Sequence, residues 1–319
     1  MTSRRFFLSS LILTLALAAV IVGANVLIDT YGYFRGTGGR RVKMYYNERL
    51  EKNLLSRRYV PENFNGLLLG ASTSFNIDTA RFQPLQIYNL SILAGTITEV
   101  KLLVDNYLEV RNPRLVIISM YPYMLRERGL KTAYLSERAV LGALGSLDIL
   151  KRYAIAAWQD LSEEEPYNEY GYHEYEDPPR ERSLELIREK AEDPDYPYEE
   201  LALDIFAWQE YLELLRDLEE SGARIIQYLH PIPRPVYLAH RAFFDRFAAQ
   251  VTAVLPAGAI TVDFNVDAHR ALTEDLENFQ DEVHLSGKGS RVMEQKLHEV
   301  LVEHLNPADF QEPDEEEEE

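Results

Sequence analysis

A serine at a predicted strand end and a distant Asp–His pair are the residues whose types and spacing could carry out acyl chemistry. The apolar run at 67–69 meets Gly70 and then Ser72, a pattern typical of a buried strand that ends in a turn and exposes a side chain above a sheet. A serine hydroxyl needs a base, and a third group must orient that base. Asp281 and His284 supply both types close to the end of the chain. We expect Ser72 to be the nucleophile, His284 its general base and Asp281 the orienting carboxylate.

Each of these residues also has a purely structural interpretation. Small hydroxyl residues such as Ser72 often cap a following helix, Asp281 has the same capping chemistry, and a histidine such as His284 can simply be held by hydrogen bonds. Taken singly, the structural interpretations prevail. The catalytic hypothesis depends on the combination of a serine at a strand-end turn with Asp-x-x-His just before the last predicted helix.

The order of these parts resembles the SGNH, or GDSL-type, hydrolase superfamily. The first block of that family places the nucleophilic serine two residues after a glycine, as Ser72 follows Gly70, and its last block is Asp-x-x-His, as in 281–284. The stretch 89–96 resembles the second block. The resemblance implies an oxyanion hole built from the backbone amides of Ser72 and Gly95.

The third block of the family is missing. The family has Gly-x-Asn-Asp after a buried strand, whereas the segment 115–123 contains no asparagine. A side chain near Tyr121 or Tyr123 would have to replace that donor, or the reaction would be slow. Further polar residues at predicted strand ends are expected in the cleft, and they are Asn89, Ser91 and His230. A loop position held by neighbouring prolines is the alternative for His230.

An uncharged run of 23 residues, 6–28, follows Arg4 and Arg5 near the start of the chain. It is long enough to cross a hydrocarbon layer of about 30 Å as a helix, and basic residues before it favour a cytoplasmic N-terminus. We therefore expect residues 1–30 to form a single-pass anchor in the inner, or cytoplasmic, membrane, with the rest of the chain in the periplasm. A cleaved signal peptide and a twin-arginine export signal at 3–8 are the alternatives.

The anchor and the segment 29–33, Asp-Thr-Tyr-Gly-Tyr, resemble the membrane-anchored branch of the SGNH superfamily, which includes proteins related to alginate O-acetylation and to D-alanyl transfer onto teichoic acids. This resemblance implies an extracytoplasmic serine esterase or O-acyltransferase. Its substrate would be an acylated carbohydrate or other ester of an envelope or exported polysaccharide, and a membrane acyltransferase complex would be its partner. A non-catalytic relative that binds glycan or scaffolds an export complex is the alternative, and a superficial likeness is a third.

Composition argues against several other classes. The formal net charge of −19 argues against nucleic acid as a partner, because binding a phosphate backbone relies on clustered Lys and Arg. The chain has no cysteine, which removes disulfides and thiolate metal ligands. No His, Asp or Glu cluster has the spacing of a metal site. We expect neither a metal nor a cofactor.

Apolar runs and helical periodicity alternate along the rest of the chain. Strands are predicted near 66–69, 86–90, 115–119, 223–229 and 260–264, and helices near 79–85, 97–110, 212–221, 239–255 and 288–305. Uninterrupted apolar runs are typical of strands buried on both faces of a parallel sheet. The alternation predicts an α/β fold with a doubly wound, mostly parallel sheet of the flavodoxin-like kind, whose ligands bind at the carboxyl ends of the strands.

Changes in composition suggest the domain boundaries. We expect a polar, partly basic linker at 31–63, an α/β domain at 64–305 and an acidic, disordered tail at 306–319. The segment 124–211 breaks the alternation with prolines, tyrosines and acidic residues. It is expected to be an inserted helical or irregular lid or substrate-binding flank, and a surface excursion without a ligand is the alternative.

Overall fold

A five-stranded parallel sheet forms the centre of the computed structural model, which describes residues 3–40, 42, 47–158, 167–198 and 201–306. The strands are β1 (Gly66–Leu69), β2 (Ile87–Asn89), β3 (Leu115–Met120), β4 (Arg224–Leu229) and β5 (Ile260–Asp263). Their order is β2-β1-β3-β4-β5, and every neighbouring pair is parallel. This is the strand order of a flavodoxin-like, doubly wound α/β fold, as predicted.

Helices cover both faces of the sheet. One face packs against α2 (Glu48–Leu55), α5 (Ile97–Leu108) and α9 (Ile205–Glu220). The other packs against α10 (Arg234–Ala239), α12 (Arg270–Glu274) and α13 (Gly287–His304), and α11 (Arg241–Ala253) contributes to both. Successive side chains of a strand point to opposite faces, so Leu67 joins the first core and Leu68 the second.

The remaining elements are short or belong to the insertion. The insertion contains α6 (Glu137–Leu144), α7 (Leu147–Trp158) and α8 (Arg180–Glu192), and it runs into the start of α9. The short elements are α3 (Tyr59–Asn63), α4 (Ser72–Phe75) and the 3₁₀ turns η1 (Thr79–Phe82), η2 (Pro122–Leu125), η3 (Ala133–Leu135), η5 (Asp267–His269) and η6 (Leu276–Asn278).

The segment 31–63 is not the solvated linker that its polar composition predicted. Most residues of α2 are buried, and so is Tyr59 of α3. Buried charged groups are tolerated where they find partners, and Lys52 of α2 donates a hydrogen bond to the carbonyl of Ser91. The described residues of this segment are therefore part of the folded α/β domain.

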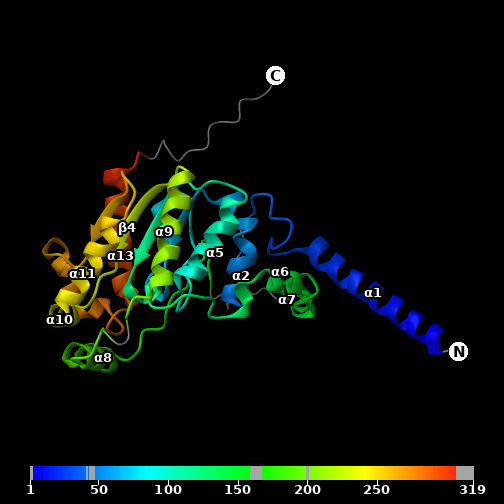
Figure 1. The fold of residues 1–319 in the computed structure, drawn as a ribbon, viewed down its shortest axis with the longest axis horizontal. Helices are drawn as coiled ribbons and strands as arrows, with labels where there is room; N and C mark the ends of the chain where they lie inside the picture. The colour runs from blue at the N-terminus through cyan, green and yellow to red at the C-terminus, as the bar shows by residue number, and fades with distance from the viewer. Residues whose placement is uncertain (1–2, 41, 43–46, 159–166, 199–200, 307–319) are drawn as a thin grey trace, which may run out of the picture.

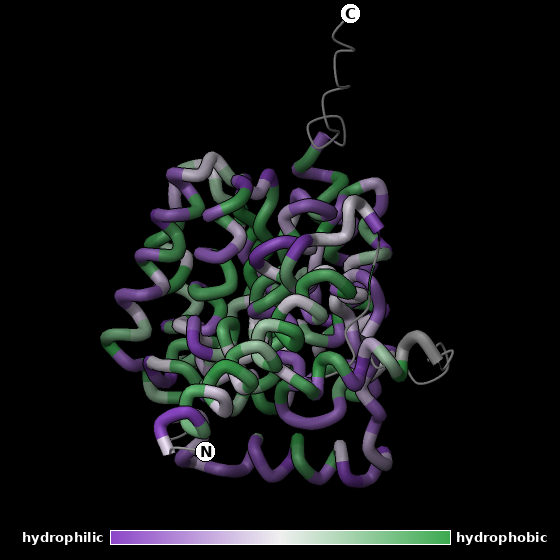
Figure 2. Tube along the Cα trace, turned by 90° about the vertical axis from the view of Figure 1, so that its right-hand side faces the viewer, coloured by the Kyte–Doolittle hydropathy of each residue, from purple (hydrophilic) through white to green (hydrophobic). Residues whose placement is uncertain are grey.

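α1 (Ser3–Ile28) projects away from the α/β domain (Figure 1) and is hydrophobic along most of its length (Figure 2). Its side chains from 3 to 20 are all exposed. The helix is long and apolar enough to cross a membrane, although a signal sequence would have the same properties. The predicted acidic tail lies almost entirely outside the described residues, which end at 306.

Candidate active site

Ser72 stands where β1 ends and α4 begins. The turn between them is tight, because a side chain at Gly70 would place its Cβ 2.0 Å from Oγ of Ser74 and 2.9 Å from Cβ of Ser119. Only glycine fits such a close approach. The turn leaves Ser72 at the carboxyl edge of the sheet, where doubly wound folds bind their ligands.

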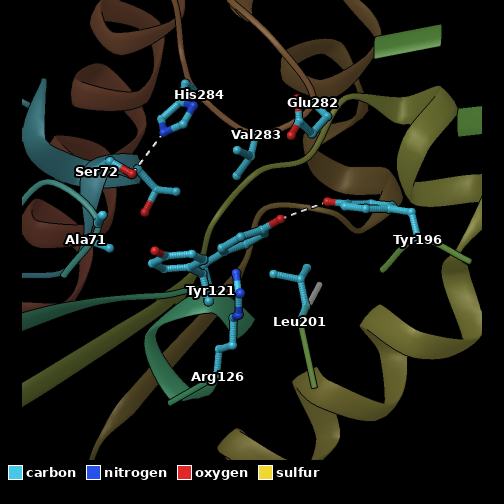
Figure 3. A pocket seen from close by; sticks show the side chains of 12 residues that line it. Ala71, Ser72, Tyr121, Arg126, Tyr196, Leu201, Glu282, Val283 and His284 are labelled. Atoms are coloured by element: carbon cyan, nitrogen blue, oxygen red, sulfur yellow. Dashed lines mark hydrogen bonds between the residues drawn. The ribbon is translucent and has the colours of Figure 1, made fainter. Parts of the chain in front are cut away.

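A chain of hydrogen bonds joins Ser72, His284 and Asp281. Nε2 of His284 lies 2.9 Å from Oγ of Ser72 (Figure 3), and Nδ1 lies 2.7 Å from Oδ2 of Asp281. The other carboxylate oxygen of Asp281 accepts hydrogen bonds from the amides of Val283 at 2.9 Å and His284 at 2.7 Å. The backbone therefore holds the carboxylate, and the carboxylate holds the imidazole with Nδ1 protonated and Nε2 facing the serine hydroxyl.

The two charged groups shift each other's pKa. Burial lowers the pKa of His284, but the hydrogen bond and the negative charge of Asp281 outweigh burial and raise that pKa above its ordinary value. Burial raises the pKa of Asp281, yet the hydrogen bonds from His284 and the two amides leave it below its ordinary value. An ionised carboxylate therefore supports an imidazole that readily accepts a proton, which is the property that a general base requires.

His230 supports the loop that carries His284 and, contrary to prediction, does not line the cleft beside Ser72. It is 1% exposed, and its Nε2 lies 2.7 Å from the carbonyl oxygen of Val283. Burial lowers the pKa of His230 to about 3, so the ring is neutral and donates its Nε2 proton to this carbonyl. From the other side, Nδ2 of Asn76 donates to the carbonyl of Leu285 at 2.9 Å. The loop is thus tied both to the end of β4 and to α4.

Asn89 and Ser91 are buried and hold the backbone, contrary to their predicted place in the cleft. Nδ2 of Asn89 donates to the carbonyls of Ser74 at 2.9 Å and Ile77 at 3.0 Å. Its Oδ1 accepts from the amide of Ser91 at 2.9 Å, and Oγ of Ser91 lies 2.8 Å from Oγ of Ser74. The two residues fix α4 against the loop at 91–96.

The amide of Gly95 is engaged away from the predicted oxyanion site. It donates to the carbonyl of Ile92 at 2.9 Å, closing a turn in which Ala94 has a φ of +49°. Ala94 lines the cavity beside Ser72, and its amide makes none of the backbone hydrogen bonds found among the described residues. The amide of Ser72 is the first of α4 and has no acceptor within that helix. Ser72 and Ala94 are therefore two residues at this edge whose amides have no backbone acceptor among the described residues.

A cavity of about 300 Å³ opens beside Ser72 and His284. Its walls come from the serine turn, the segment after β3, the insertion and the Asp–His loop (Figure 3). The lining residues are Ala71, Ser72, Thr73, Ala94, Tyr121, Tyr123, Arg126, Tyr196, Leu201, Glu282, Val283 and His284. Both tyrosines predicted for the cleft are thus in its wall, and the volume is at the lower end of small-molecule sites.

The insertion packs directly on the serine and the histidine. Its residues Tyr196 and Leu201 line the cavity, and the hydroxyls of Tyr196 and Tyr121 are hydrogen bonded at 2.9 Å. Oη of Tyr175 donates to the carbonyl of Ser72 at 3.1 Å, and its ring meets that of His284 edge-on, with the centroids 6.2 Å apart. The insertion therefore forms part of the cavity wall and lies against the imidazole.

Arg126 and Glu282 bring charged groups to the cavity wall. The side chain of Arg126 points into the cavity (Figure 3), 5.6 Å from the centre of the Tyr123 ring. Burial and the neighbouring Asp281 raise the pKa of Glu282. The cavity thus holds the permanent positive charge of Arg126 and the carboxyl group of Glu282, which is harder to ionise than an exposed glutamate.

Sequence reasoning did not find Arg126, Glu282, Tyr175, Tyr196 or Leu201. Glu282 could have been suspected, because it adjoins Asp281. The others lie after β3 or in the insertion, where the sequence has no period that would assign them to a face. Within the described part of the chain, no group of three or more His, Asp or Glu side chains is placed to hold a metal ion.

Comparison with known proteins gives structural neighbours but no sequence relatives. No family model and no curated protein matches the chain. A solved structure from Streptococcus pneumonia, provisionally described as a platelet activating factor, has a TM-score of 0.41 at 12% identity and aligns over 80% of this chain and 91% of its own. A GDSL-like lipase from Bacteroides thetaiotaomicron has a TM-score of 0.36 at 10% identity, over 75% and 88% of the two chains. A provisionally assigned acylhydrolase from Bacteroides fragilis has a TM-score of 0.33 at 12% identity and aligns over 76% of this chain and 88% of its own.

Proposed function

We propose that this protein is a membrane-anchored, extracytoplasmic serine esterase or O-acyltransferase of the SGNH type. The hydrogen-bonded chain of Ser72, His284 and Asp281 beside a cavity carries the proposal. A serine hydroxyl within reach of an oriented imidazole is the arrangement that acyl transfer requires.

The first half of the reaction acylates Ser72. Nε2 of His284 takes the hydroxyl proton as Oγ bonds to the carbonyl carbon of the ester, and Asp281 stabilises the imidazolium. The oxyanion faces the backbone amides of Ser72 and Ala94, with Ala94 taking the place expected for Gly95. The intermediate collapses with loss of the alcohol, which leaves with the proton from His284.

The second half transfers the acyl group. Water, or a sugar hydroxyl, attacks the acyl carbon and gives its proton to His284, which returns it to Oγ of Ser72 as the enzyme is released. Attack by water makes the protein an esterase, and attack by a sugar makes it an O-acyltransferase. An acyl group on envelope or exported polysaccharide suits an anchored extracytoplasmic domain, and Tyr123, which is partly exposed in the cavity wall, offers a ring against which a sugar can pack.

The test is hydrolysis of a short-chain aryl acetate by the full-length protein in detergent, with and without a sugar acceptor. Ser72→Ala and His284→Ala should each lower kcat by about 10³-fold or more. Ser221→Ala, at the C-terminal end of α9, is the matched control and should keep the parent rate. A folded parent that neither hydrolyses nor transfers would instead favour a non-catalytic glycan-binding protein. Variants as active as an active parent would refute catalysis by Ser72 and His284.

A further inference from the structure

The last turns of α1 are fastened to the hairpin formed by α6 and α7. Asn25 makes this contact: it is fully buried, and its Nδ2 donates to the carbonyls of Leu144 at 2.8 Å and Ser146 at 3.0 Å. Carbonyls at the C-terminal end of a helix have no partner within that helix. Asn25 therefore caps α6 from another helix and ties the hairpin to the end of α1.

The length of α1 places this contact at the edge of a bilayer. With 26 residues the helix is about 39 Å long, against about 30 Å for a hydrocarbon core. Asn25 lies close to its C-terminal end, Ile28, about 4.5 Å away along the axis. When α1 spans a bilayer, Asn25 and the hairpin bound to it lie at the boundary between hydrocarbon and headgroups.

The hairpin exposes large apolar side chains that no described part of the chain covers. Leu141 is 68% exposed and Leu147 is 64% exposed, whereas Ala143 and Ile149 are buried against the domain. On α7, Lys151 follows Leu147 by one helical turn on the same face and is also exposed. Leucines flanked by a lysine are typical of a helix that lies in a membrane interface, with its apolar side in the lipid and its amine at the headgroups.

The arrangement of the domain brings this face to the membrane. Figure 1 shows α6 and α7 beside the end of α1, on the same side of the domain, while α8, α10 and α13 lie at the far side. A bilayer crossed by α1 would therefore meet the hairpin first.

We propose that the α6–α7 hairpin is a lipid-binding surface that sits in the headgroup layer of the bilayer crossed by α1. Leu141 and Leu147 enter the acyl boundary, and Lys151 reaches the lipid phosphates. The proposal depends on the retention of α1 in the membrane, which belongs to the proposed function. Two attachments, the span and the hairpin, fix the orientation of the domain and hence of the cavity beside Ser72 relative to the lipid surface.

The absence of cysteine from the chain allows a direct test with single labels on the full-length protein. Leu141→Cys and Leu147→Cys each receive an environment-sensitive fluorophore, and the protein is reconstituted into vesicles of phosphatidylcholine and phosphatidylglycerol. Val302→Cys on α13 is the matched control, because Val302 is also 64% exposed. Leu13→Cys reports whether α1 spans the bilayer. Quenching is measured with spin-labelled lipids and with a water-soluble quencher.

The proposal predicts several-fold stronger quenching by spin-labelled lipid at 141 and 147 than at 302, and several-fold weaker quenching by the aqueous reagent. The proposal would be overturned if spin-labelled lipid quenches the label at position 13 but quenches the labels at 141, 147 and 302 to the same extent. If spin-labelled lipid does not quench the label at position 13, α1 does not cross the bilayer and the proposal falls with it. Neither result depends on catalysis, so failure of the hairpin and failure of the Ser72 chemistry remain distinguishable.

Discussion

Replacing Asp281 with asparagine changes almost no volume, yet it reverses one hydrogen bond. Oδ1 of an asparagine can still accept from the amides of Val283 and His284, so the loop keeps its shape. The amide nitrogen, however, takes the place of Oδ2, which lies 2.7 Å from Nδ1 of His284. Because that nitrogen is a donor, Nδ1 must accept, and the imidazole proton moves to Nε2, which faces Ser72. A protonated Nε2 cannot take the serine proton.

The expected loss in kcat is about 10³- to 10⁴-fold, which corresponds to about 4–5.5 kcal/mol of activation free energy. KM should change little, because Asp281 is not among the residues that line the cavity. The free energy of unfolding should fall by no more than about 3 kcal/mol, since one charge-assisted hydrogen bond is lost while the backbone bonds stay.

Steady-state hydrolysis of an aryl acetate by the full-length protein measures this effect, with urea unfolding as the check on folding. Glu282→Gln is the matched control, because it makes the same chemical change at the next residue, which lines the cavity without a hydrogen bond to the His284 ring. It should cost less than about tenfold in kcat. An Asp281→Asn enzyme as active as Glu282→Gln would refute the assigned tautomer and the role of Asp281.

Three further predictions follow from the cavity and its supports. Because Asp281 raises the pKa of His284 and the base must be neutral, kcat/KM should rise with pH through a midpoint above the ordinary histidine value of about 6.5; a lower midpoint in the pH–rate profile would contradict this base. Asn89→Ala removes the partner of several buried backbone groups. It should lower the free energy of unfolding, measured by urea denaturation, by about 3 kcal/mol or more. If Asn89 instead faced the substrate, the variant would change KM and leave the free energy of unfolding unchanged. Arg126→Gln should raise KM roughly tenfold for a carboxylate-bearing ester and leave KM for a neutral ester unchanged. Arg128→Gln is the control, because the guanidinium of Arg128 pairs with Glu210. Equal effects of Arg126→Gln on the two esters would argue against anion binding.

β1 and β3 could be predicted because each consists mostly of a continuous apolar run. All six side chains of β3 are buried, and an uninterrupted run of this kind is typical of the middle of a parallel sheet. The burial of α2 could not be predicted in the same way. Its charged residues are typical of a surface helix, and the partner that allows Lys52 inside, the carbonyl of Ser91, lies 39 residues away.

The serine, the aspartate and the histidine could be proposed from the order of their motifs, but the other cleft residues depended on packing. A polar residue at a strand end can face a ligand, or it can turn inward and hold the backbone, and local sequence does not distinguish the two. Asn89 and His230 turn inward, whereas Tyr121 and Tyr123 line the cavity. The contacts of Tyr175 with the serine turn come from an insertion with no regular period, so they follow only from the tertiary structure.

Covalent labelling of Ser72 tests the proposed nucleophile most directly. A fluorophosphonate reacts with a serine only when a neighbouring base activates it, and mass spectrometry of proteolytic fragments locates the adduct. The hydrogen bond between Ser72 and His284 predicts a single adduct on Ser72, absent from Ser72→Ala and formed much more slowly in His284→Ala. A folded full-length protein that takes up no label, or a Ser72→Ala variant labelled as fast as the parent, would contradict the serine mechanism.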